Sequence, residues 1–154
     1  MNANRTICLL AVCLALVGST LAQEKRIDRS ELPKAVEKTV QQQSKGATVR
    51  GFSKEKENGK IAYEAKMIVN GQTKDVLIDA NGTVLEIEEQ IELQALPVDV
   101  KAGLQARVGK GKITKVESIT KKDKLVAYEA QVTTDGKKSE VQVGPDGKPL
   151  DHEK

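Results

Sequence analysis

Side chains that could act as catalysts or metal ligands are few in this chain of 154 residues. The one histidine, His152, lies close to the C-terminal end, and both cysteines, Cys8 and Cys13, fall in an apolar run near the N-terminus. A Ser-His-Asp triad, a Cys-His pair and a typical zinc site all need histidines or cysteines that converge in the fold. We therefore predict no catalytic residues, no cofactor and no metal site, and expect that the protein is not an enzyme.

Carboxylates are plentiful, but their spacing is that of turns and exposed strands. Asp79-Ala80-Asn81-Gly82 and Asp146-Gly147 resemble fragments of a calcium loop, yet an EF-hand needs oxygen ligands over a longer, fixed spacing. Hairpin turns explain both segments better. An acidic run could bind a cation or a basic peptide, although a solvated strand edge is the default interpretation. Its members are Glu86, Glu88, Glu89 and Glu92.

The N-terminal segment has the order of a secretory signal peptide. Arg5 precedes an apolar run from Ile7 to Val17, and small residues then lead to Ala22 before charged positions begin. We predict a signal peptide over residues 1–22, with an uncleaved anchor as the alternative. The mature protein is expected to be periplasmic or secreted, without stable membrane insertion after cleavage, because the apolar run is shorter than a membrane-spanning helix.

Composition argues against nucleic acid as a partner. The chain has two tyrosines, one phenylalanine and no tryptophan, and its formal net charge is only +3. A surface for single strands needs aromatic rings on which bases stack, and phosphate binding needs a larger excess of basic residues.

An internal repeat is visible in the sequence. Leu32-Pro33 recurs as Leu96-Pro97, and Tyr63-Glu64-Ala65 recurs as Tyr128-Glu129-Ala130. We interpret this as duplication, with one repeat over residues 30–94 and the second over residues 95–154. One extra residue in the second copy, near Lys122-Asp123-Lys124, predicts a longer first hairpin there.

Periodicity predicts the elements of each repeat. Apolar residues at intervals of four, Leu32, Val36 and Val40 in the first copy, indicate a helix with one apolar stripe. Alternating runs separated by Asn-Gly or Asp-Gly dipeptides then predict antiparallel hairpins, with Tyr63 and Tyr128 on inner faces. The expected fold class is α+β, as two tandem repeats that each pack a helix on a three- to four-stranded antiparallel meander. Residues 88–95 are either the end of a long strand or a short helix.

The arrangement of Leu-Pro before a helix, a Tyr-Glu-Ala strand and a closing Asn-Gly turn at Asn81-Gly82 resembles the PepSY-like, β-lactamase-inhibitor-like (BLIP-like) group of exported bacterial domains. The resemblance covers nearly all of the mature chain. It implies a small non-enzymatic binding module outside the cytoplasm, which in some relatives inhibits hydrolases, with no catalytic residues. It also implies that two tandem units present a concave sheet surface to the partner.

Outward-facing positions of the first repeat predict where a protein or peptide partner binds. Apolar side chains there alternate with charged ones, whereas the second repeat has polar residues at the equivalent places. Two explanations are open: these residues pack inside the chain, or they form a partner face. The alternative function is a structural or stress-related extracytoplasmic protein without a dedicated ligand. The candidate partner face comprises Ala62, Glu64, Lys66, Ile68, Asp75 and Leu77.

Overall fold

The computed structural model describes residues 24–57 and 59–150, and over them strands greatly outnumber helices. The strands are β1 (Lys25–Ile27), β2 (Thr48–Glu57), β3 (Lys60–Val69), β4 (Gln72–Asp79), β5 (Val84–Gln90), β6 (Lys112–Lys121), β7 (Lys124–Thr134) and β8 (Lys137–Val143). The helices are α1 (Lys34–Gln43) and α2 (Val98–Val108), and two short 3-10 turns cover Arg29–Glu31 and Leu93–Ala95.

All eight strands form one antiparallel sheet in the order β1 to β8. The predicted fold of two tandem helix-plus-sheet repeats is therefore wrong. The reason lies in β5, which runs past its pairing with β4 and also pairs with β6, placing Glu88 opposite Ile119 and Gln90 opposite Glu117. A strand whose two edges are both hydrogen-bonded leaves no break at which separate sheets could end.

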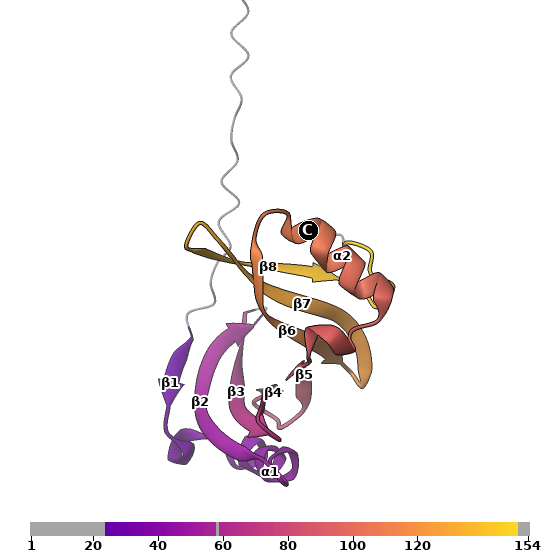
Figure 1. The fold of residues 1–154 in the computed structure, drawn as a ribbon. Helices are drawn as coiled ribbons and strands as arrows, with labels where there is room; N and C mark the ends of the chain where they lie inside the picture. The colour runs from indigo at the N-terminus through magenta and orange to yellow at the C-terminus, as the bar shows by residue number, and fades with distance from the viewer. Residues whose placement is uncertain (1–23, 58, 151–154) are drawn as a thin grey trace, which may run out of the picture.

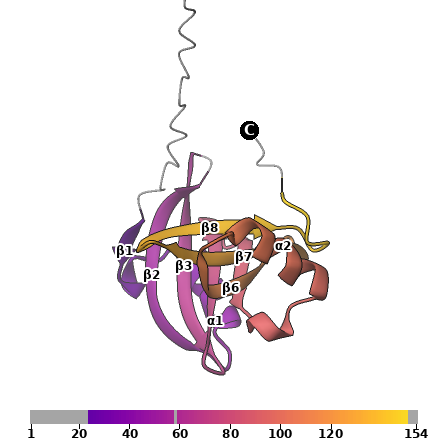
Figure 2. The ribbon, with the colours of Figure 1, turned by 45° about the horizontal axis from the view of Figure 1, so that its top comes forward.

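The sheet is strongly curved. Figures 1 and 2 show β7 and β8 running roughly across the direction of β2 and β3, and Figure 1 shows β5 between the two groups. Both helices pack on the same face of the sheet. Side chains alternate between the two faces along each strand, and the strand register puts the residues beneath α1 and those beneath α2 on the same side. Ala65 of β3 is opposite Val76 of β4, which is opposite Ile87 of β5, and Ile87 is opposite Thr120 of β6.

Two hydrophobic clusters lie between the helices and this face. Val36 and Val40 of α1 are fully buried in the first cluster, and Val100 and Leu104 of α2 are fully buried in the second. The predicted apolar stripes are thus confirmed. Burial of a complete Val or Leu side chain contributes about 1.5–3 kcal/mol, so these four positions account for much of the attachment of the short helices.

The hairpins follow the predicted turn residues with one exception. Asn70 and Gly71 join β3 to β4 with positive φ at both positions, as expected of a two-residue turn. Lys122 and Asp123 also form a two-residue turn with positive φ, so the prediction of a longer hairpin there is wrong. The pairing of β6 with β7 instead slips at Ile119, and Val126 is the extra residue of a β-bulge.

Gly103 has a packing role in α2. A Cβ atom at this position would overlap the main-chain carbonyl of Gly147, so the glycine lets the helix lie directly on the turn after β8. Gly82 does the same for α1, where a Cβ would lie 2.7 Å from the Ala35 carbonyl oxygen. Thr39 secures that contact by donating a hydrogen bond of 2.6 Å to the Gly82 carbonyl.

The predicted signal peptide and His152 lie outside the described residues. Among the residues that the structure does describe, no helix has both the length and the apolar character required to cross a bilayer.

Candidate functional site on the open face

The face of the sheet opposite the helices, here called the open face, carries all six residues of the candidate partner face. Strand alternation puts Ala62, Glu64, Lys66 and Ile68 of β3 on this side, and pairing with β4 sets Asp75 opposite Lys66 and Leu77 opposite Glu64. Ala62 is only 1% exposed and cannot itself touch a partner. The other five are partly exposed.

Parts of the open face are buried although no helix covers them. Ile119 and Ala127 are 3% and 2% exposed, and they pair across β6 and β7 beside the acidic residues of β5. Curvature explains this burial, because a sheet that bends toward one side crowds the side chains on that side together. The open face is therefore concave.

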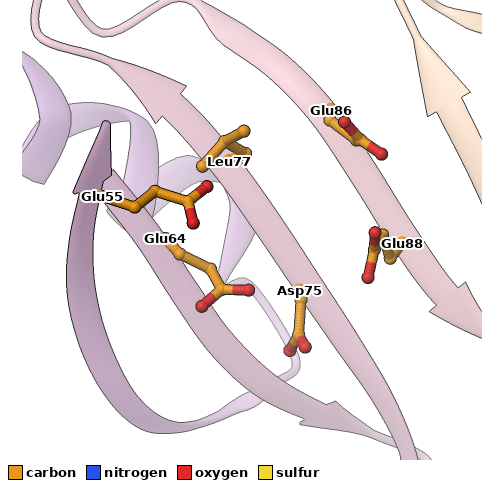
Figure 3. A pocket seen from close by; sticks show the side chains of 6 residues that line it. All are labelled: Glu55, Glu64, Asp75, Leu77, Glu86 and Glu88. Carbon is orange, nitrogen blue, oxygen red and sulfur yellow. The ribbon is translucent and has the colours of Figure 1, made fainter. Parts of the chain in front are cut away.

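A cavity of about 110 Å³ lies in this concavity. Its wall has contributions from four neighbouring strands, and Figure 3 shows the side chains projecting from them around a common space. Five of the six lining residues are acidic. They are Glu55, Glu64, Asp75, Leu77, Glu86 and Glu88.

Some of these carboxylates have partners. Glu64 accepts a hydrogen bond of 2.9 Å from the Ser53 hydroxyl and lies 3.1 Å from the Lys66 ammonium. Glu86 pairs with Lys121 at 3.0 Å. Burial acts to lower the pKa of Lys66, but hydrogen bonds with Glu24 and Glu64 outweigh it and raise the pKa.

Asp75 and Glu88 are less well compensated. Together with Glu117 of β6 they form an acidic triad in which one carboxylate oxygen of each residue lies within 4.8 Å of those of the other two. Burial, followed by the charges of Glu117 and Glu129, raises the pKa of Glu88 to about 8. Burial, with Glu64 adding to it and Lys115 opposing it, raises the pKa of Asp75 to about 6.

Glu117 was missed by the sequence analysis. In the sequence, Glu117 is one of the outward-facing residues of an ordinary alternating strand, and no neighbouring residue indicates that it lies close to β4 and β5. The information lies in the pairing of β5 with β6, which places Gln90 opposite Glu117 and brings that carboxylate beside Glu88. The acidic run that contains Glu88 was the signal in the sequence for an acidic site here, but it was interpreted by default as a solvated strand edge.

The size of the cavity limits its chemistry. A carboxyl group with a raised pKa beside an ionised one is the arrangement used in general acid–base catalysis. Pockets for small-molecule substrates, however, usually enclose about 300–1,000 Å³. A cavity of about 110 Å³ fits a cation or the end of one side chain instead.

Comparison with known proteins places the fold. No protein-family model matches the chain, and no curated protein sequence does. A BLIP-like protein from Bacteroides fragilis superposes with a TM-score of 0.58 at 19% identity, covering 78% of this chain and 84% of that one. A DUF2874 family protein from Bacteroides ovatus gives 0.61 at 19% identity, covering 78% and 85%. A protein from Bacteroides eggerthii, proposed to be periplasmic, gives 0.63 at 17% identity, covering 78% and 86%.

These likenesses show a BLIP-like fold, which is the architecture that the sequence resemblance implied. The likeness to PepSY-like domains and the duplication stay predictions. Identities below 20% concern the fold alone, since one fold serves many functions. What the chain does must be argued from its own open face.

Proposed function

We propose that this protein is a non-enzymatic, extracytoplasmic binding module that recognises a protein or peptide on the open face of its sheet. The apolar run at residues 7–17 and the fold shared with a protein proposed to be periplasmic support export. The absence of a substrate-sized cavity at the acidic site supports binding rather than catalysis.

The observation that carries the proposal is the position of Leu77. This leucine lies between Glu64 and Glu86 across the strands, lines the acidic cavity and is partly exposed. Ile68 is a second partly exposed apolar side chain of the open face, separated from Leu77 by Lys66 and Asp75. Because both helices pack on the other face, partly exposed apolar side chains here have a contact to gain from a partner.

A quantitative capture experiment tests the proposal. Wild-type protein and the double variant Ile68→Thr with Leu77→Gln are immobilised and incubated with the exported protein fraction of the source cells. The substitutions give the open face the polar residues found at the corresponding places of β7 and β8. We expect a partner held by the wild type to be recovered at least about tenfold less by the double variant, which corresponds to about 1.4 kcal/mol of binding free energy.

Val98→Gln is the matched control, because Val98 is 83% exposed at the start of α2, away from the open face. It should recover the same partner as the wild type. Equal recovery by the double variant would refute the proposal. A loss of about 2 kcal/mol or more in its free energy of unfolding would instead favour packing within the chain.

A further inference from the structure

The acidic triad of Asp75, Glu88 and Glu117 joins three neighbouring strands in the middle of the sheet. Asp75 is on β4, Glu88 on β5 and Glu117 on β6, and their nearest carboxylate oxygens are mutually within 4.8 Å. Two oxygens that ligate one calcium ion at about 2.3–2.6 Å can lie up to roughly twice that distance apart, so the spacing is compatible with one shared ion.

The triad is poorly compensated within the described residues. Neither the Asp75 nor the Glu88 carboxylate there makes an ion pair or accepts a hydrogen bond. Glu117 is 2% exposed, and its Oε1 atom is buried without a hydrogen-bond donor. Lys115 Nζ lies 2.6 Å from that oxygen as an ion pair, but the contact does not have the geometry of a hydrogen bond.

Charge completes the argument. With all three carboxylates ionised, the triad and Lys115 carry a net charge of −2 in a largely buried place, and buried charge without compensation is costly. A divalent cation would neutralise it. The donors are oxygens only, which suits hard cations such as Ca²⁺ and Mg²⁺ and not the softer metals that prefer histidine or cysteine.

We propose that Asp75, Glu88 and Glu117 form a binding site for one hard divalent cation, with Ca²⁺ preferred over Mg²⁺. Calcium is preferred because it accepts irregular sets of carboxylates and water, whereas magnesium demands a near-ideal octahedron. The ion ties β4, β5 and β6 together across the centre of the sheet. This site does not depend on the proposed protein partner.

Further charged groups surround the triad. The carboxylates of Glu64, Glu86 and Glu129 add to its negative charge, while Lys66 and Lys115 oppose it.

Calorimetric titration of chelator-treated protein with CaCl₂ at pH 8, and in parallel with MgCl₂, tests the site without any partner present. We expect saturable binding of one Ca²⁺ with weaker Mg²⁺ binding, and a higher unfolding temperature in Ca²⁺.

Two variants test the ligands. Glu117→Gln and Glu88→Gln should each weaken Ca²⁺ binding by about tenfold or more, because affinity depends on the number of charged ligands. Glu88→Gln, which breaks no ion pair, should also stabilise the calcium-free protein because it removes repulsion, and a purely structural role would predict the opposite sign. Glu88 is partly exposed, so its variant remains informative if Glu117→Gln folds poorly.

Glu89→Gln is the matched control, because it makes the same charge change one residue along β5 on the helix-covered face. It should bind Ca²⁺ as the wild type does. The inference would be overturned by the absence of saturable binding of either cation up to about 10 mM, a range that covers weak extracellular calcium sites. Equal affinity of Glu88→Gln and the wild type would also overturn it.

Discussion

Lys115 Nζ lies 2.6 Å from Glu117 Oε1, and the side chain of the glutamate is only 3% exposed. Loss of the lysine would leave a buried carboxylate without a positive partner, which typically costs about 3–5 kcal/mol. We expect Lys115→Met to lower the free energy of unfolding by about 3 kcal/mol in chelator at pH 8, measured by urea denaturation. The double variant of Lys115→Met with Glu117→Gln should recover most of this lost free energy of unfolding. A loss below about 0.5 kcal/mol would contradict the pairing.

Stability should fall as the pH rises through the neutral range. The Glu88 carboxyl has a pKa of about 8 in the folded protein against an ordinary value of 4.5, so the folded state binds the proton more tightly than the unfolded state. The stability that this tighter proton binding gives the folded state is therefore lost as the pH rises from about 4.5 to about 8. Denaturation in chelator should show this slope, and Glu88→Gln should reduce it. An unchanged slope in that variant would assign the effect to other groups.

Gly103→Ala should destabilise the protein although alanine is the better helix former. The added methyl group would overlap the Gly147 carbonyl, and overpacking typically costs about 1–3 kcal/mol, against a gain of about 1 kcal/mol in helix propensity. We expect a net loss, measured as a lower urea midpoint. Gln105→Ala, on an exposed position of α2, should stay within about 0.5 kcal/mol of the wild type. A more stable Gly103→Ala would show that the turn after β8 can move away.

The two tyrosines should differ in importance. Tyr128 is 7% exposed within the cluster beneath α2, whereas Tyr63 is only partly buried at the margin of the cluster beneath α1. Tyr128→Ala should cost about 3 kcal/mol or more, and Tyr63→Ala should cost less because solvent already reaches its ring. Chemical denaturation of both variants in parallel decides this. Equal losses would mean that Tyr63 is as deeply packed as Tyr128.

Local features were the predictable part of this fold. Apolar residues such as Val36 and Val100 repeat with the period of a helix, and Asn70-Gly71 has the backbone freedom that a tight hairpin needs. Period-two alternation also assigned the faces of β3 and β4 correctly, so the candidate partner face lies on one side of the sheet.

Long-range pairing was beyond such reasoning. Whether Glu88 ends a strand or pairs onward with Ile119 depends on hydrogen bonds between segments far apart in the chain, which side-chain patterns do not encode. The prediction of separate sheets failed for this reason. The same gap hid Glu117, since it joins Asp75 and Glu88 only after β6 has paired with β5.

Every neighbouring pair of strands in the sheet is also consecutive in sequence. Such a topology keeps the contact order lower than that of a sheet with crossovers, because each new strand needs only the one before it, and lower contact order favours faster folding. The sheet can therefore be built strand by strand from β1 toward β8. The triad of Asp75, Glu88 and Glu117 is completed only when β6 has paired with β5, so the cluster of like charges forms after β1 to β5 can already be in place.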